Sequence, residues 1–180
     1  DESRSVLVTG SSPGVGKTTT AINYAFSLAQ AGHSVILIEG DMRRPTVGWA
    51  LGVRPVVGIG AVLINQASLE DALVTTEASG GNLRLLLVER AAGSLADRLS
   101  LPTARQIIRE AEALADYVVV DSPPLTEVID ALPLAQEVGA VLIMARLGTS
   151  RLHKLNQLGE ILAQGGVTPA GIALVGVDRA

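Results

Sequence analysis

The sequence predicts an α/β protein in which a doubly wound, mainly parallel β-sheet carries helices on both faces. Short apolar runs alternate with amphipathic stretches along the 180 residues, which is typical of β-α-β units. Apolar residues make up 48% of the chain and aromatic residues only 2%. The core must therefore consist of Leu, Val, Ile and Ala, as in parallel strands buried between helices. The length suits one domain, residues 1–180, with a core of its own.

The predicted strands are short apolar runs that end at turn residues or charged groups. The run 34–39, Ser-Val-Ile-Leu-Ile-Glu, is apolar on both faces, as expected for a strand buried between two layers of helices. The run 117–120, Tyr-Val-Val-Val, is of the same type and leads into Asp121. The full set of predicted strands is 5–9, 34–39, 83–88, 117–120, 140–145 and 171–177.

Helical periodicity and capping residues predict the segments between these strands. Gly32 suits a left-handed cap at the end of the first helix. Ser68 is a favoured N-cap, and Pro102 fits the first turn of a helix. Between residues 40 and 57 the repeated Gly and Pro predict loops and short turns. The predicted helices are 17–31, 59–65, 69–74, 102–115, 131–137 and 151–164.

Charge and cysteine content exclude several classes of function. The net charge of −4 argues against a general nucleic-acid-binding protein. The chain has no cysteine, which excludes disulfides, cysteine-bound zinc and thiol catalysis. No apolar run approaches the roughly 18 residues of a membrane-spanning helix. Because the chain begins with Asp rather than Met, we expect it to be a domain taken from a longer, membrane-associated protein.

The loop after the first predicted strand has the layout of a P-loop. It reads Thr-Gly-Ser-Ser-Pro-Gly-Val-Gly-Lys-Thr-Thr-Thr (9–20) and leads into a predicted helix, whose first amides lack partners and favour an anion. Lys17 would reach the β- and γ-phosphates of ATP, and the Thr18 hydroxyl would bind Mg²⁺. In the strict spacing Ser11 would be Gly, and the alternative is a glycine-rich turn before an ordinary helix. The residues expected to bind the nucleotide are Pro13, Gly14, Val15, Gly16, Lys17, Thr18 and Thr19.

Acidic residues end two of the buried strands. Asp121 follows the strand 117–120 at the edge of the sheet where ligands bind, and a carboxylate there can hold Mg²⁺. Glu39 and Asp41 follow the strand 34–39, with Arg43 just beyond. Two such carboxylates can bind metal or accept a proton, and an arginine can offset charge on a transferring phosphoryl group. The alternatives are an acid that only caps a strand and a solvated charge cluster.

These three stretches together resemble the Walker A, Walker A′ and Walker B motifs of the bacterial tyrosine kinases (BY-kinases). That family belongs to the MinD/ParA-like branch of P-loop ATPases. The first motif is met by Thr9 and by the run from Pro13 to Thr18, the second by Asp41, Arg43, Arg44 and Pro45, and the third by Val118 to Pro124. The absence of a lysine at Ser11 or Ser12 favours the kinases over the MinD/ParA proteins.

The resemblance implies an ATP- and Mg²⁺-dependent kinase that phosphorylates tyrosines of its own kind in a ring of subunits. Such domains lie at the cytoplasmic face of the membrane, act with a membrane polysaccharide co-polymerase and regulate capsule or exopolysaccharide synthesis. By resemblance, Thr18, Asp41 and Asp121 would be the metal ligands. The catalytic residues would be Lys17, Glu39, Asp41, Arg43 and Asp121.

Three features depart from the family pattern. Glu39 replaces the first Walker A′ aspartate, and its extra methylene displaces the carboxylate enough to weaken catalysis that depends on positioning. On that basis Glu39→Asp is expected to raise the rate or leave it unchanged. The last ten residues contain no tyrosine, and the family's E-x-x-R-x-x-R interface motif is absent upstream of the P-loop.

Two other functions fit the same motifs. One is a MinD/ParA-like switch ATPase, which transfers phosphate only to water. The other is a degenerate module that binds nucleotide with little turnover, as Glu39 and Ser11 suggest. Arg146, after the strand 140–145, has two interpretations, a phosphate contact or a solvated side chain.

Overall fold

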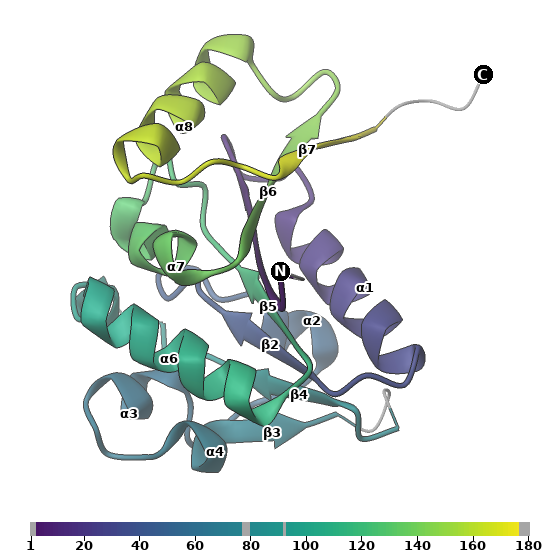
Figure 1. Ribbon diagram of the computed structural model, residues 1–180, viewed down its shortest axis with the longest axis vertical. Coiled ribbons are helices and arrows are strands. Elements are labelled where there is room, and N and C mark those ends of the chain that lie inside the picture. Colours follow the sequence, from purple (N-terminus) through teal and green to yellow (C-terminus); the bar gives the residue numbers. More distant parts are fainter. Residues whose placement is uncertain (1–2, 77–79, 92, 177–180) are drawn as a thin grey trace.

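The computed structural model describes residues 3–76, 80–91 and 93–176, and these form a seven-stranded sheet between two layers of helices (Figure 1). The strand order is β3-β4-β2-β5-β1-β6-β7. β3 is antiparallel to β4, and every other neighbouring pair is parallel. The predicted doubly wound, mainly parallel sheet is therefore confirmed. The strands are β1 (Ser5–Gly10), β2 (Val35–Glu39), β3 (Leu73–Thr75), β4 (Leu83–Leu86), β5 (Tyr117–Asp121), β6 (Ala140–Arg146) and β7 (Gly171–Val175).

Helices cover both faces of the sheet. The first helix packs its small residues Ala21, Ala25 and Ala29 against one face, in a core with Val8 and Leu37. The other long helices cover the opposite face, where they bury a larger aliphatic core (Figure 1). The helices are α1 (Lys17–Gln30), α2 (Val47–Leu51), α3 (Ile59–Leu63), α4 (Leu69–Ala72), α5 (Gly93–Ala96), α6 (Leu101–Leu114), the 3₁₀ helix η2 (Ile129–Ala131), α7 (Leu132–Glu137) and α8 (Leu152–Gln164).

The central strands explain where a ligand site can form. Every residue of β2 is buried, because β2 lies between β4 and β5 with helices on both sides. The register pairs Glu39 of β2 with Asp121 of β5, and Val8 of β1 with the same aspartate. Since these strands are parallel, their carboxyl ends and the loops that follow them meet at one edge of the sheet.

Three segments differ from the sequence prediction. The predicted helix 69–74 is only α4, which Ser68 caps as expected by accepting the Asp71 amide at 3.1 Å. The chain then turns into β3, because Leu73 pairs with Leu86 at the edge of the sheet. Within 40–57 the structure has α2, where only turns were expected, and it has α5, which was not predicted. Residue 177 of the predicted last strand lies outside the described residues.

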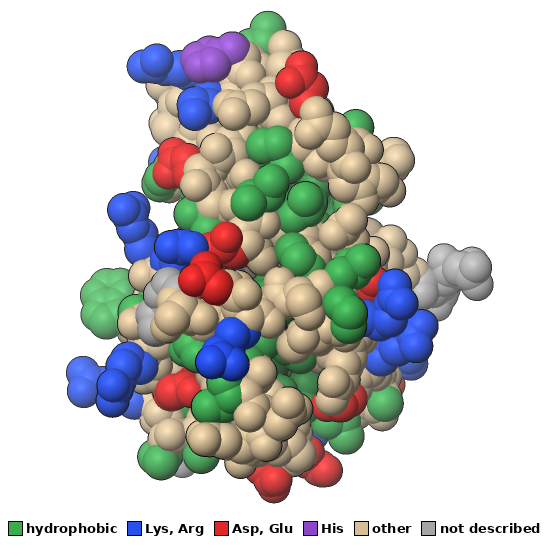
Figure 2. Space-filling view, turned by 90° about the vertical axis from the view of Figure 1, so that its left-hand side faces the viewer, with side chains coloured by type: hydrophobic (Ala, Val, Ile, Leu, Met, Phe, Trp, Pro, Cys, Tyr) green, Lys and Arg blue, Asp and Glu red, His purple; other side chains and the backbone are tan. Residues whose placement is uncertain are grey.

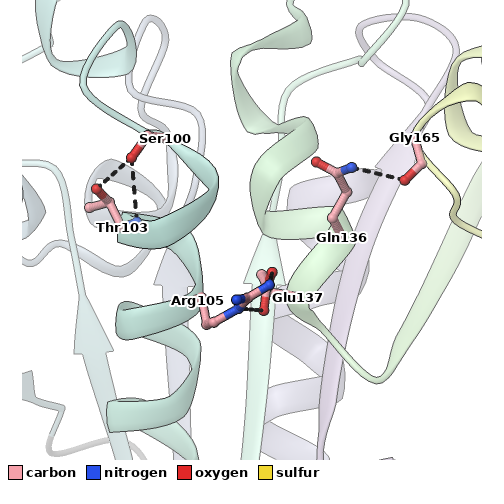
Figure 3. A network of polar contacts seen from close by, with 6 residues as sticks. All are labelled: Ser100, Thr103, Arg105, Gln136, Glu137 and Gly165. Atoms are coloured by element: carbon pink, nitrogen blue, oxygen red, sulfur yellow. Dashed lines mark hydrogen bonds and ion pairs between the residues drawn. The ribbon is translucent and has the colours of Figure 1, made fainter.

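Polar contacts join the layer of α6 and α7 (Figure 3). Arg105 of α6 donates two hydrogen bonds of 2.9 Å to the Glu137 carboxylate of α7. The Ser100 hydroxyl caps α6 by accepting the Thr103 amide. On the face that these helices cover, acidic, basic and apolar side chains are interspersed (Figure 2). No helix among the described residues is long and apolar enough to cross a bilayer.

Candidate nucleotide-binding site

A cleft of 390 Å³ opens at the edge where β1, β2 and β5 end. Three loops from these strands form its walls, so that segments more than a hundred residues apart in sequence meet in one place. The first wall is the loop into α1, the second follows β2, and the third follows β5. The residues that line the cleft are Pro13, Gly14, Lys17, Thr18, Asp41, Arg43, Arg44, Thr46, Ser122, Pro124, Glu127 and Val128.

The loop between β1 and α1 has the backbone conformation that its glycines allow. Gly14 has a φ of 74° and Gly16 a φ of 96°, in the left-handed region that favours glycine. Gly10 is needed for a different reason, because a Cβ there would lie 2.8 Å from the Val15 side chain and 3.0 Å from the Met144 carbonyl oxygen. Gly10, one position before Ser11, therefore lets the loop fold close against β6.

Lys17 follows this loop as the first residue of α1, with only 8% of its surface exposed. Its ammonium donates a hydrogen bond of 3.2 Å to the Ser12 carbonyl oxygen. Burial lowers the pKa of Lys17, and the nearby carboxylates of Asp121, Asp41 and Glu127 counteract part of that effect. A buried cation with one weak hydrogen-bond partner in the described part of the chain is suited to bind an anion such as a phosphate.

Thr18 and Asp121 come together as the sequence predicts. The Thr18 hydroxyl donates a hydrogen bond of 2.8 Å to Asp121 Oδ2. Asp121 is 1% exposed, and its second oxygen, Oδ1, is buried with no partner among the described residues. Burial is the main reason why the pKa of Asp121 is raised to about 7.

These residues fit a magnesium ion that is bound together with a phosphate. A hydroxyl and a carboxylate with an unpartnered oxygen are ligands that Mg²⁺ or its waters accept. The described residues contain no cluster of three or more His, Cys, Asp or Glu that could hold a metal without a ligand. The protein alone therefore offers only part of a coordination shell, as in sites where Mg²⁺ arrives with nucleotide phosphates.

Asp41 and Arg43 both line the cleft, but each already has protein partners. Asp41 Oδ1 accepts the Arg44 amide at 2.9 Å, which shapes the loop after β2. Arg43 donates from Nε to Asp130 Oδ2 at 2.6 Å and also pairs with Asp97 at 3.5 Å. The hydrogen bond to Asp130 is the largest cause of the raised pKa of Arg43. In this arrangement its guanidinium is turned to Asp130 rather than to the P-loop.

The structure does not place Glu39 where the sequence analysis expected it. Its Oε1 accepts the Val47 amide at 2.6 Å and its Oε2 accepts the Val88 amide at 2.9 Å. The carboxylate lines a second cavity, with Trp49 and Glu89, and is absent from the lining of the cleft. Burial raises the pKa of Glu39, and the backbone amides of Val88, Val47, Thr46 and Gly48 oppose that shift. The longer side chain thus carries its carboxylate past the cleft and into a backbone contact.

Several residues at the site were not put forward from the sequence as site residues, among them Thr46, Glu127 and Arg146. Thr46 and Glu127 line the cleft, and the Thr46 hydroxyl lies 3.3 Å from that of Thr18. Arg146 borders a smaller cavity beside Gly14, Lys17 and Thr19, which favours the first of its two interpretations. Thr46 directly follows Arg43-Arg44-Pro45, and this position next to a motif is the one signal that could have indicated it.

Comparison with known proteins identifies the family. A family model described as an AAA domain matches residues 3–164. The chain is 32% identical over 160 residues to the tyrosine-protein kinase YwqD of Bacillus subtilis, covering 89% of this chain and 67% of that protein. It is 30% identical to the tyrosine-protein kinase CpsD of Streptococcus pneumoniae, covering 99% of this chain and 78% of that protein. The chain belongs to the bacterial tyrosine-protein kinases.

Solved structures of this kinase family agree with the fold. The kinase domain of the Escherichia coli tyrosine kinase ETK superposes with a TM-score of 0.91 at 28% identity, covering 99% of this chain and 70% of that one. MinD of Pyrococcus horikoshii, solved with Mg-ADP, matches with a TM-score of 0.80 at 22% identity, over 95% of this chain and 69% of that one. The second likeness concerns the fold alone. Other kinase relatives are longer, and the chain spans 24% of the kinase wzc of Salmonella typhimurium.

Proposed function

We propose that this chain is the catalytic domain of an ATP- and Mg²⁺-dependent protein-tyrosine kinase that regulates the synthesis or export of a polysaccharide. The observation that carries the proposal is the bond between Thr18 and Asp121, with the unpartnered Asp121 oxygen beside Lys17. The membership in the kinase family, whose relatives include CpsD and CapB, supports the same function.

Each residue of the cleft has a role that its position allows. The amides after Gly14 and the Lys17 ammonium would bind the terminal phosphates, and Thr18, Asp121 and Asp41 would hold Mg²⁺ directly or through its waters. ATP with Mg²⁺ supplies an activated phosphoryl group. Asp41, which lines the open cleft, is placed to orient the hydroxyl of an incoming tyrosine and to receive its proton. Arg43 would contribute to charge stabilisation only after release from Asp130.

We further infer that the tyrosines are presented by a neighbouring copy in a ring-type assembly. This arrangement is what the family resemblance implies. We place the domain at the cytoplasmic face of the membrane with a polysaccharide co-polymerase as partner, which is the setting that the family resemblance implies. No direct contact with nucleic acid is part of this function.

A second candidate, a switch ATPase that transfers phosphate to water, is favoured by one observation. Glu39 does not reach the cleft, so that Asp41 and Asp121 are the two carboxylates of the predicted set left beside the phosphates. Such a site still binds nucleotide and activates water, but has one fewer group to orient a tyrosine.

Incubation of the full-length parent protein with γ-labelled ATP and Mg²⁺ distinguishes these functions. Label on protein tyrosine is the expected result, and Lys17→Met should abolish it. Free phosphate without labelled tyrosine would replace the kinase by the switch ATPase. Nucleotide binding without either product would indicate a degenerate module, and binding that survives Lys17→Met would overturn the P-loop assignment.

A further inference from the structure

Glu39 acts as a cap for a helix in which another residue occupies the N-cap position. Thr46 is the N-cap residue of α2, yet its side chain makes no capping hydrogen bond. Instead the Glu39 carboxylate accepts the amide of Val47, the first residue of that helix, at 2.6 Å. Threonine is a favoured N-cap because its hydroxyl accepts the amide of the second or third helical residue. The amide of Gly48, the second residue of α2, also interacts with the Glu39 carboxylate and opposes the rise in its pKa. In this protein Glu39 takes over part of that role from the neighbouring strand.

The consequence is that the Thr46 hydroxyl faces the cleft instead of capping its own helix. Thr46 Oγ1 lies 3.3 Å from Thr18 Oγ1 and lines the cavity that contains Lys17. Thr18 in turn binds Asp121, whose second oxygen has no partner among the described residues. The two hydroxyls and the carboxylate therefore form a continuous polar row, of which Thr46 is the outer member.

Glu39 holds this arrangement at two points. Its Oε2 accepts the Val88 amide at 2.9 Å, just beyond the end of β4, and the carboxylate is almost completely buried. One carboxylate thus ties the end of β2 to α2 and to the segment after β4. An aspartate at this position is shorter by one carbon–carbon bond, about 1.5 Å, and cannot reach both amides without a shift of the backbone.

We propose that Glu39 is a positioning residue, which caps α2 in place of Thr46 and thereby keeps the Thr46 hydroxyl in the cleft as a second hydroxyl for the phosphate or the magnesium waters. The proposal rests on the proposed nucleotide site. It also reverses the expectation for Glu39→Asp, because the shorter acid would release Thr46 to cap its own helix and turn its hydroxyl out of the cleft.

The test is a double-mutant cycle on the affinity for Mg·ADP, measured by calorimetry and free of turnover. Thr46→Val should weaken binding by about two- to tenfold, the usual range for one hydrogen bond. Glu39→Asp should weaken it by a similar factor, and the double variant should bind no more weakly than Thr46→Val alone. Thr46→Ser, which keeps the hydroxyl, should bind Mg·ADP with the wild-type affinity.

Two measurements separate positioning from a general loss of structure. Amide hydrogen exchange of Val47 should accelerate in Glu39→Asp and stay slow in Thr46→Val. Thr168→Val is a matched control, because this exposed threonine precedes β7 at the opposite edge of the sheet, and it should leave the affinity unchanged. The role of Thr46 would be overturned if the losses of Mg·ADP affinity in the two single variants added up in the double variant. It would also be overturned if Thr46→Val bound Mg·ADP as tightly as the wild type.

Lys17→Met shows which proposal has failed. If Lys17→Met abolishes Mg·ADP binding while the affinity losses of Thr46→Val and Glu39→Asp add in the double variant, the nucleotide site stands and the positioning role of Glu39 is wrong. If it leaves binding intact, the nucleotide site itself is wrong, and the positioning role, which depends on that site, falls with it.

Discussion

Asp121 shows how this site keeps a polar group ready for a ligand at a cost to the empty protein. Its carboxyl is 1% exposed, one oxygen accepts a hydrogen bond from Thr18, and the other has no partner among the described residues. Burial therefore raises the pKa of Asp121 to about 7, against the favourable effects of Thr18 and Lys17. A cation in the cleft would offset this cost, because it stabilises the charged carboxylate.

Asp121→Asn should stabilise the protein in the absence of metal and nucleotide, and more so at high pH. The wild-type pKa is higher in the folded state than the ordinary value of 3.8, so the folded protein binds more protons and loses stability as pH rises from about 4 towards 8. In Asp121→Asn this loss of stability with rising pH is absent, because the amide does not titrate. The difference should be close to zero at pH 4 and reach the order of a few kcal/mol at pH 8.

Urea unfolding at several pH values with EDTA measures that difference. Thr18→Val serves as the comparison, because it removes the hydroxyl and leaves Asp121 without its donor, and should therefore destabilise the protein above pH 7. A wild-type stability that rises between pH 4 and 8 relative to Asp121→Asn would contradict the raised pKa.

Among single residues, the sequence was sufficient to place those whose partners are close in the chain or fixed by a motif. Lys17 and Thr18 begin α1 directly after the P-loop, and Asp121 ends a buried strand, so that their meeting at the sheet edge follows from the parallel topology. Glu39 could not be placed in this way. Its partners Val47 and Val88 are eight and 49 residues distant, and only the folded chain brings their amides to the carboxylate.

Among the elements, the sequence identifies those whose signal is a continuous apolar run or a strong cap. β2 and β5 were predicted because both are continuous apolar runs, and α6 because Pro102 fits its first turn. β3 was missed because three residues carry too little periodicity, and its strand conformation comes from pairing with β4. The short helix α2 depends on Glu39, a contact outside its own sequence.

The close contact between β1 and the P-loop predicts the effect of a single methyl group. Gly10→Ala would place a Cβ 2.8 Å from the Val15 side chain and 3.0 Å from the Met144 carbonyl oxygen. The loop must shift to avoid this overlap, which should cost about 1–3 kcal/mol of stability and weaken nucleotide binding. Chemical unfolding and Mg·ADP titration of the same sample measure both effects.

Gly159→Ala is the matched control for that substitution. Gly159 lies inside α8, and a Cβ there meets no atom within 4 Å. The alanine should stabilise the protein by about 0.5–1 kcal/mol through its higher helix propensity and leave nucleotide affinity unchanged. A Gly10→Ala protein as stable as the wild type would show that the loop is not packed as described.

For the whole molecule, the sheet separates two cores and brings the loops of distant segments together at one edge. One core lies under α1 and the other under α6, α7 and α8 (Figure 1). Alternating apolar runs and amphipathic stretches were sufficient to predict this layered class. The strand order was not predictable from the patterns, because all central strands are similarly apolar and their neighbours are chosen by packing and by the connections.

Since the cleft is formed by loops from three strands, a nucleotide bound there should stabilise the whole domain. Mg·ADP at one hundred times its dissociation constant should add about 2.7 kcal/mol to the free energy of unfolding, with an unchanged denaturant m-value. Lys17→Met should lose this increment. Its stability without ligand should stay at or above that of the wild type, because a buried ammonium with a lowered pKa is replaced by an apolar side chain. Equal stabilisation of both proteins by Mg·ADP would mean that the nucleotide binds elsewhere.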